Sequence, residues 1–328
     1  MMKISSKLLA ILKESRSFLI AGHINPEGDS IGSCLALALG LKNLGKKKIS
    51  VISKDPVPEN LKFLPASGII RHQLPRGEVD AAVLIDCNSM ERTGFSSFKA
   101  KKTVIIDHHL LPASTAEARF FQSVSASLVD PGAAAAGVLV YRVLKALNVP
   151  IDKKIATNLY TALLVDTGGF RYSNSSPESL KTAFHLVKAG AMPWSITKDL
   201  YENIPFRGVK LLGLSLSTLE RKDGIAWITT TKEMFEKTGT SAGDCEDFVD
   251  FPRKVKGVEV AVFFRQAEDD LFKLSLRSKG RVNVQKIAKA FGGGGHAAAA
   301  GCKIRGSLED VQKRVFRVLR KALTETGR

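Results

Sequence analysis

Short apolar runs that alternate with longer helical patterns constrain the first half of this chain most strongly. Four runs are strand candidates: Phe18–Gly22, Ile49–Ser53, Val79–Ile85 and Thr103–Ile106. Helical patterns cover residues 35–44, 131–147 and 152–165, and Gly45 supplies a stop for the first of them. Runs this short and apolar do not form surface helices. Their alternation with helices is typical of a mainly parallel sheet with helices on both faces.

The pattern changes after residue 190. A helical stretch, roughly Trp194 to Leu219, leads into three hairpin-like strand segments at 225–231, 258–265 and 271–277. A short helix from Val284, the glycine run Gly292–Gly295, a strand at 302–305 and a long basic helix from about Leu308 close the chain. We therefore predict a mainly parallel α/β domain at 1–190, a helical linker at 191–221 and a smaller α+β domain at 222–328.

Composition narrows the class of protein. The 328 residues are enough for two domains that each bury a core, and 44% hydrophobic with 25% charged residues excludes a largely disordered chain. No apolar run approaches the ~18–20 residues of a membrane span, and the N-terminus lacks the apolar core of a secretory signal. The four cysteines are scattered without a CxxC pair, so neither a zinc ribbon nor a disulfide framework is expected. We expect a cytoplasmic protein, and the net charge of +17 favours an anionic partner.

Carboxylates and imidazoles follow three of the predicted strands, and one more carboxylate ends a predicted helix. They are His23, Glu27 and Asp29, then Asp86, then Asp107, His108 and His109, and finally Asp166. In open α/β sheets ligands bind beyond the carboxyl ends of the strands, so these side chains define a predicted site. A single Asp in such a place is often only a helix cap. Taken alone, Asp29 or Ser30 fits a cap on the following helix about as well as it fits a ligand site.

The residue types in this site predict divalent metal ions. Carboxylate and imidazole ligands without a thiolate favour Mn²⁺, Mg²⁺ or Fe²⁺ over a structural zinc. Six ligands from this set of eight side chains already exceed what one ion with open water positions uses, whereas two ions about 3.5–4 Å apart that share one carboxylate account for that number. Such a pair activates water and neutralises charge on a phosphoryl group. The site therefore suits hydrolysis of a phosphoester or phosphoanhydride.

Five segments, in this order, carry a resemblance to a known family. They are Gly22–Ser33 (GHINPEGDSIGS), Leu84–Asn88 (LIDCN), Asp107–His109 (DHH), Val165–Asn174 (VDTGGFRYSN) and Gly292–Gly301 (GGGGHAAAAG). Together they resemble the DHH phosphoesterases and, within that family, the bacterial nanoRNases. The likeness covers nearly the whole chain.

The resemblance assigns the six candidate ligands to two metal ions, most simply Mn²⁺. One ion would be held by His23, Glu27 and Asp86. The other would be held by Asp29, Asp86, His108 and Asp166, so that Asp86 bridges the pair. Glu27 stands where the family usually has Asp, and its longer side chain implies an altered metal preference rather than lost activity.

The resemblance also implies residues that handle the substrate. Asp107 would orient the histidine pair, and His109 would face the scissile phosphate as a hydrogen-bond donor or proton source. The last domain would grip the substrate through Arg277, Ser278, Gly293, Gly294, Gly295 and His296. Glycine backbone lets a phosphate approach closely, although a glycine run is also typical of a plain turn. Alanines at 133–136 and 297–298 and Val138 replace residues that are often polar in relatives.

The implied activity is two-metal hydrolysis of short oligoribonucleotides to 5′-mononucleotides and of pAp to AMP, in a homodimer. Two alternatives stay open. The same metals could hydrolyse a linear or cyclic dinucleotide. A non-catalytic basic protein that binds nucleic acid would also fit the net charge of +17. Pyrophosphate and polyphosphate fit less well, because they carry no base for the glycine and histidine loop to contact.

Overall fold

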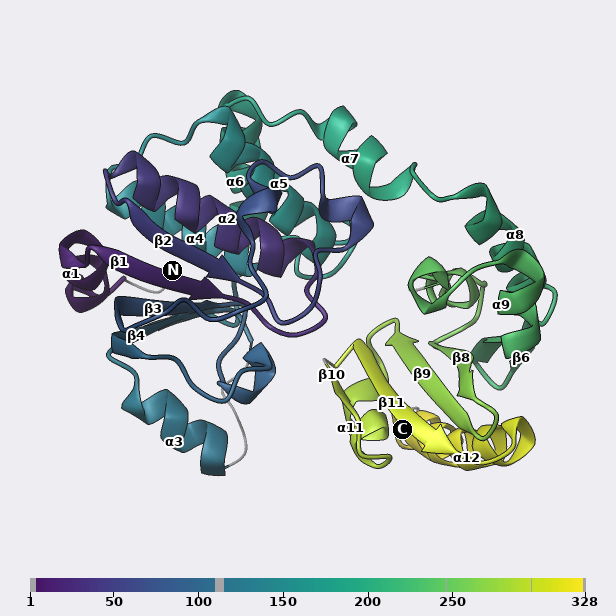
Figure 1. Ribbon diagram of the computed structural model, residues 1–328. Helices are drawn as coiled ribbons and strands as arrows, with labels where there is room; N and C mark the ends of the chain where they lie inside the picture. The colour runs from purple at the N-terminus through teal and green to yellow at the C-terminus, as the bar shows by residue number, and fades with distance from the viewer. Residues whose placement is uncertain (1–3, 110–114, 246, 296, 327–328) are drawn as a thin grey trace. The chain divides into compact units, whose positions relative to one another are not determined.

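The protein divides into two compact units in the computed structural model, Met1–Asn203 and Ile204–Arg328 (Figure 1). The structure describes residues 4–109, 115–245, 247–295 and 297–326. Each unit has its own hydrophobic core. Within the described residues, no helix combines the length and apolar character that crossing a membrane requires.

The predicted linker at 191–221 contains two helices that fall in different units. Helix α7 (Pro193–Tyr201) packs Ile196 and Leu200 into the core of the first unit. Helix α8 (Phe206–Leu216) packs Leu211 into a core cluster of the second unit. The three-part division with limits at 190 and 221 stays a prediction.

A five-stranded parallel sheet forms the centre of the first unit and confirms the predicted fold class. Its strands, in the spatial order β2-β1-β3-β4-β5, are β1 (Ser17–Ala21), β2 (Lys48–Ile52), β3 (Val79–Ile85), β4 (Ala100–Asp107) and β5 (Ala126–Val129). The sequence prediction lacks β5, because this strand has four residues and only two of them are buried. A run so short gives no clear pattern.

Helices cover the two faces of this sheet unequally (Figure 1). The helices of the unit are α1 (Ser6–Glu14), α2 (Gly28–Asn43), α3 (Thr115–Ser123), α4 (Ala136–Ala146), α5 (Lys153–Asp166), α6 (Pro177–Lys188) and α7. One face packs against α2, α4 and α5, and α3 lies against the other. Helix α4 begins later than the predicted residue 131, because Asp130 forms a turn that accepts hydrogen bonds from Gly132 and Ala133.

The second unit contains a mixed six-stranded sheet in the order β10-β11-β9-β8-β7-β6. Its strands are β6 (Glu220–Lys222), β7 (Ile225–Thr230), β8 (Val260–Glu268), β9 (Leu271–Ser278), β10 (Gly294–Gly295) and β11 (Ala299–Arg305). Strands β8 and β9 form the predicted antiparallel hairpin. Strand β7 also forms an antiparallel hairpin, with β6, whereas it pairs with β8 in parallel. Parallel neighbours need a crossover, which the helical segment between them supplies.

Helices cover one face of the second sheet and only part of the other. The remaining helices are α8, α9 (Lys232–Thr238), α10 (Asp250–Arg253), α11 (Val284–Lys289) and α12 (Leu308–Thr326). Val262 and Leu274 point toward the core cluster that includes residues of α11 and α12. Phe263, on the opposite face of β8, packs in the cluster that includes Leu211 of α8. Strands β9 and β11 leave the side chains of this second face at least partly exposed.

Candidate metal centre

Two glycines of α2 bring the first part of the site together. A Cβ atom on Gly28 would lie 2.5 Å from a Val165 methyl group, and one on Gly32 would lie 2.4 Å from the Asn158 carbonyl oxygen. Both contacts are with α5, so only residues without a side chain allow the two helices to approach so closely. Asp29 at the start of α2 and Asp166 at the end of α5 are thereby held at one edge of the sheet.

Asp86 follows β3 in a backbone conformation that few residues adopt. Its φ is 57°, in the left-handed region, while its N–H still donates to Ile106 O at 3.0 Å. This conformation costs a non-glycine residue about 1–2 kcal/mol, and Asp is among the side chains that tolerate it best. This turn directs the Asp86 carboxylate into the site. Asp86 is only 2% exposed. Backbone strain of this kind clusters at functional positions.

The first cluster contains His23, Glu27 and Asp86, whose potential ligand atoms all lie within 4.8 Å of one another. His23 Nδ1 contacts Ile24 O at 2.7 Å, and its Nε2 lies 3.2 Å from Asp86 Oδ2. A histidine that donates its Nδ1–H to a carbonyl presents Nε2 to a metal. Burial lowers the pKa of His23, but its contact with Asp86 and the charge of that carboxylate outweigh burial and raise it to about 9.

The second cluster contains Asp29, His108 and Asp166. His108 Nε2 lies 3.7 Å from Asp29 Oδ2, 3.4 Å from Asp86 Oδ1 and 3.3 Å from Asp166 Oδ2. His108 Nδ1 contacts Ala133 O at 3.3 Å. Three carboxylates therefore converge on one imidazole nitrogen, and that imidazole is oriented from behind by a carbonyl.

The electrostatics of the two clusters favour a bound cation. Burial, and then the charge of Asp86, raise the pKa of Asp29 to about 7. Burial and the charge of Asp29 likewise raise the pKa of Asp166 well above its ordinary value. Among the described residues, Asp86 Oδ1 and Asp107 Oδ2 are buried without a hydrogen-bond partner. Buried carboxylates this close together are stable only when paired with cations or protons, so the donor set fits divalent metal ions.

Asp107 contacts only one of the two histidines that it was predicted to orient. Its Oδ1 lies 2.6 Å from His109 Nδ1 and accepts a hydrogen bond from the His109 backbone N–H at 3.2 Å. His109 Nδ1 also lies 3.3 Å from Asp86 Oδ1. The partner that orients His108 is the Ala133 carbonyl instead.

Two residues that support the clusters were not singled out from the sequence. Ser33 Oγ donates to Asp29 Oδ1 at 2.9 Å. Asn174 Nδ2 donates to the carbonyls of Ala134 and Asp166, both at 3.0 Å. Asn174 is the last residue of the VDTGGFRYSN segment, and its position in that segment could have indicated a role in the site.

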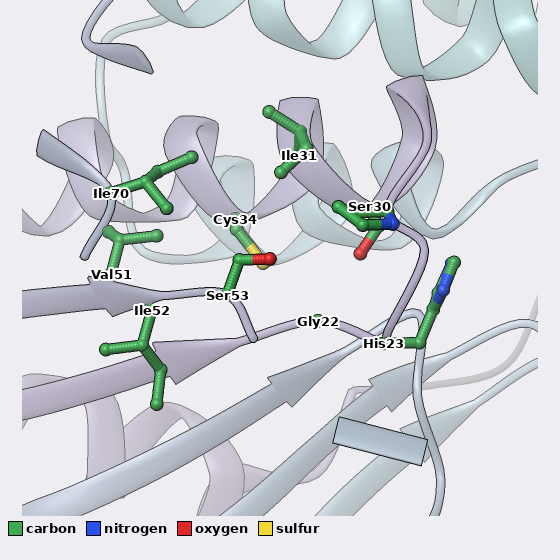
Figure 2. Close-up of a pocket in the computed structure, with 10 residues that line it drawn as sticks. Gly22, His23, Ser30, Ile31, Cys34, Val51, Ile52, Ser53 and Ile70 are labelled. Atoms are coloured by element: carbon green, nitrogen blue, oxygen red, sulfur yellow. The ribbon is translucent and has the colours of Figure 1, made fainter. Parts of the chain in front are cut away.

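Figure 2 shows a small cavity beside His23, between α2 and the ends of β1 and β2. Its volume is about 10 Å³, and its lining includes Ser30, Cys34 and Ser53. A space of this size accommodates about one water molecule. It is too small for a phosphate group, so we assign no substrate to it.

The predicted substrate-binding residues of the second unit do not all share one surface. Arg277 is half-buried on the face of β9 that α11 and α12 do not cover. Ser278 is 3% exposed, and its hydroxyl donates to Glu259 Oε1 at 3.1 Å and accepts from Gly280 N at 3.0 Å. His296 lies outside the described residues. The roles assigned to these residues stay predictions.

The three glycines of the predicted phosphate loop differ in what surrounds them. A Cβ on Gly293 would lie 2.1 Å from Gly301 O, and one on Gly295 would lie 2.5 Å from Ala299 O. These two glycines allow β10 to pack against β11. A Cβ on Gly294 would meet nothing within 4 Å. Gly294 is the position whose backbone is open to a ligand.

Comparisons with known proteins agree with this arrangement. The DHH family N-terminal domain matches residues 17–163, and the DHHA1 domain matches residues 226–324. The chain is 36% identical to the bifunctional oligoribonuclease and PAP phosphatase NrnA of Thermus thermophilus, over 94% of this chain and 90% of that protein. It is 25% identical to the Bacillus subtilis protein of the same name, over 91% and 93%. An exopolyphosphatase-related protein from Bacteroides fragilis superposes with a TM-score of 0.89, at 27% identity and full coverage of both chains.

A parallel α/β sheet with carboxylates and imidazoles gathered at its carboxyl edge, followed by a mixed-sheet unit, defines a two-unit protein with a candidate metal centre. The family matches make the class specific. The chain belongs to the DHH family and carries a DHHA1 domain in its second unit, as the five sequence segments predicted.

Proposed function

We propose that this chain is a two-metal phosphoesterase that hydrolyses short oligoribonucleotides to 5′-mononucleotides and pAp to AMP. The observation that carries the proposal is the position of Asp86. Its Oδ2 lies 3.2 Å from His23 Nε2, and its Oδ1 lies 3.4 Å from His108 Nε2. A carboxylate that contacts one histidine of each cluster fits a pair of neighbouring cations. The activities for which the Thermus and Bacillus relatives are named supply the two substrate classes.

The ligand sets follow from the two clusters. His23, Glu27 and Asp86 would hold one cation, and Asp29, Asp86, His108 and Asp166 the other. Mn²⁺ suits this mixture of carboxylate oxygen and imidazole nitrogen. When bound, such a pair lowers the pKa of water and offsets negative charge on a phosphoryl group. Glu27 keeps a carboxylate in the first cluster despite its extra methylene.

His109 and Asp107 would act on the substrate side of the centre. Asp107 Oδ1, 2.6 Å from His109 Nδ1, fixes the orientation of the ring. His109 would then donate a hydrogen bond or a proton to the scissile phosphate group. The contact supports a positioning role for Asp107, because a carboxylate behind an imidazole sets its tautomer.

Arg277 and Gly294 would contact the substrate in the second unit. The Arg277 guanidinium can bind a phosphate in a bidentate manner, and the backbone at Gly294 is open to close approach. Gly293 and Gly295 would support this loop by packing on β11, and Ser278 would shape the turn after Arg277. The predicted homodimer and the contribution of His296 stay predictions.

A substrate panel tests the proposal. Purified protein with Mn²⁺ is assayed on pAp, the dinucleotide pApA, a cyclic dinucleotide and pyrophosphate, and we expect turnover of pAp and pApA. Asp86→Ala and His108→Ala should reduce turnover to background while circular dichroism stays unchanged. His72→Ala, which removes an exposed histidine hydrogen-bonded to Ser53 O, is the matched control and should keep full activity.

Each other outcome favours a named alternative. Full activity of Asp86→Ala or His108→Ala contradicts the metal assignment. Preferred turnover of the cyclic dinucleotide favours a dinucleotide phosphodiesterase. Tight RNA binding with a steep salt dependence and no turnover favours the non-catalytic alternative.

A further inference from the structure

Three cations lie in one row across the partly uncovered face of the second sheet. Arg265 on β8 is directly opposite Lys273 on β9, and Lys273 is directly opposite Lys303 on β11. Residues directly opposite one another share a face of the sheet, and like charges in such pairs destabilise it. The Arg265 guanidinium is fixed there by donating to Ala242 O at 3.0 Å. The row therefore presents three positively charged side chains on one face of the sheet.

A cavity lies directly beside the row. Its volume is about 120 Å³, and it is lined by Cys245, Phe263, Arg265, Lys273 and Ser275. The neighbours of Ser275 on this face are Phe263 and Gly301, so small side chains on β9 and β11 leave the space open. A phosphate group fits in this volume, with two cations and a hydroxyl in its lining.

The spacing along β9 matches a nucleic acid strand. Lys273, Ser275 and Arg277 alternate with the buried residues of β9 and lie on the same face. A strand rises about 3.3 Å per residue, so these three positions are about 6.6 Å apart and the two cations about 13 Å apart. Successive phosphates of an extended single strand have a similar spacing. If Arg277 contacts one phosphate, Lys273 lies where the phosphate two nucleotides along would be.

We propose that Arg265, Lys273 and Ser275 form a second phosphate subsite, which binds the backbone of an oligoribonucleotide whose terminal nucleotide is held at Arg277. The subsite rests on the proposed function and deepens it, because it separates the two substrate classes. pAp and a dinucleotide are too short to reach from Arg277 to Lys273. A chain of three or more nucleotides spans the distance, so the subsite determines the preference for longer substrates.

The experiment compares substrates of different length on paired variants. The double variant Arg265→Gln/Lys273→Gln should raise KM about tenfold for a pentanucleotide and leave KM and kcat for pAp unchanged. The control Lys313→Gln/Arg317→Gln removes the same charge from exposed positions of α12, the helix that packs on the opposite face. This control should leave the ratio of the pentanucleotide KM to the pAp KM as it is in the native protein.

A binding measurement without added metal separates this proposal from the proposed function. Fluorescence titration of a labelled pentanucleotide at several salt concentrations should give a log–log slope that is smaller by about 1 in the Arg265→Gln/Lys273→Gln variant, because contacts to about 1–2 phosphates are lost. An unchanged slope together with an unchanged pentanucleotide KM overturns the subsite. If the native protein hydrolyses neither substrate, the proposed function fails, and the slope still decides whether the subsite exists.

Discussion

The carboxylate of Asp29, in the first turn of α2, caps helix α4 by accepting the backbone N–H of Ala136 at 2.6 Å. It also accepts the N–H of Gly137 at 2.9 Å. The N-cap residue of α4 is Ala135, which has no side-chain acceptor of its own. The sequence left a cap as the alternative for Asp29, but on the helix that contains it. The structure assigns it the cap of a different helix, while its Oδ2 lies 3.7 Å from His108 Nε2.

Two substitutions at Asp29 separate the capping role from the proposed metal-binding role. Asp29→Ala leaves two helix N–H groups without an acceptor and should lower the free energy of unfolding by about 1–2 kcal/mol. Asp29→Asn keeps a carbonyl acceptor and should lose less. Both variants should lose Mn²⁺-dependent hydrolysis of pAp. Urea denaturation in chelator measures the first effect and a phosphate-release assay the second.

Either role of Asp29 can fail independently. If the Asp29→Ala variant is as stable as the native protein, the Asp29 cap does not stabilise the fold. An Asp29→Asn variant with native turnover would remove the carboxylate from the ligand set.

Local sequence patterns predicted four of the five strands of the first unit and pointed to the side chains that the structure brings together in the two clusters. Strand β3 has the predicted bounds, because an apolar run ended by Asp86 is a signal contained in a few neighbouring residues. The capping of α4 by Asp29 could not be predicted, because it joins residues 107 positions apart. The left-handed φ of Asp86 is equally invisible in the sequence, since most Asp residues do not adopt it.

In the second unit, neither the parallel pairing of β7 with β8 nor the separation of two neighbouring side chains was predicted from the sequence. Apolar alternation marks β7 and β8 as strands but carries no information on whether two strands pair in parallel or antiparallel. Arg277 and Ser278 are neighbours in the chain, and the sequence prediction assigned both to substrate binding for that reason. The period of a strand turns them to opposite faces, which separates the buried Ser278 from its neighbour.

Substitution of Gly32 tests the close approach of α2 and α5. A methyl group there would lie 2.4 Å from the Asn158 carbonyl oxygen, which is backbone and cannot move alone. Gly32→Ala should therefore destabilise the first unit by about 1–3 kcal/mol through overpacking. It should also lower turnover, because α2 and α5 carry Asp29 and Asp166. The same change at Gly213 of α8, where a Cβ meets nothing within 4 Å, should stabilise its helix by about 0.5–1 kcal/mol.

Thermal unfolding with and without Mn²⁺ tests the metal centre apart from activity. A cation that binds only the folded state at 100 times its Kd stabilises that state by about 2.7 kcal/mol. For a unit of this size we expect a rise in Tm of roughly 5–10 °C. EDTA should reverse the rise, and Asp86→Asn should abolish it while His72→Ala keeps it. If Mn²⁺ raises the Tm of the native protein and of Asp86→Asn by similar amounts, the ion binds at another site.

Asp80 gives a pH dependence that does not involve the metal centre. The hydrogen bond from Lys101 Nζ, with those from the backbone of Arg16 and Ser17 and the Ser17 hydroxyl, holds the pKa of the Asp80 carboxyl well below its usual range. A carboxyl whose pKa is lower in the folded state stabilises the fold above pH of about 4, and this contribution is lost as the pH falls further. Asp80→Asn should thus lower stability at pH 7 and flatten its decline below pH 4, measured by urea denaturation in chelator. Lys101→Met should have a smaller effect, because the backbone donors remain.

The glycine loop of the second unit offers a test in which two neighbouring positions should behave differently. Gly293→Ala places a methyl group 2.1 Å from Gly301 O and should disrupt the β10–β11 pairing, which lowers the Tm of the second unit. Gly294→Ala meets no atom within 4 Å and should leave the Tm unchanged. If the Gly294 backbone contacts a substrate phosphate, its new methyl group should raise KM for pAp severalfold without changing kcat. A Gly294→Ala variant with native KM would show that the backbone at this position does not contact the substrate.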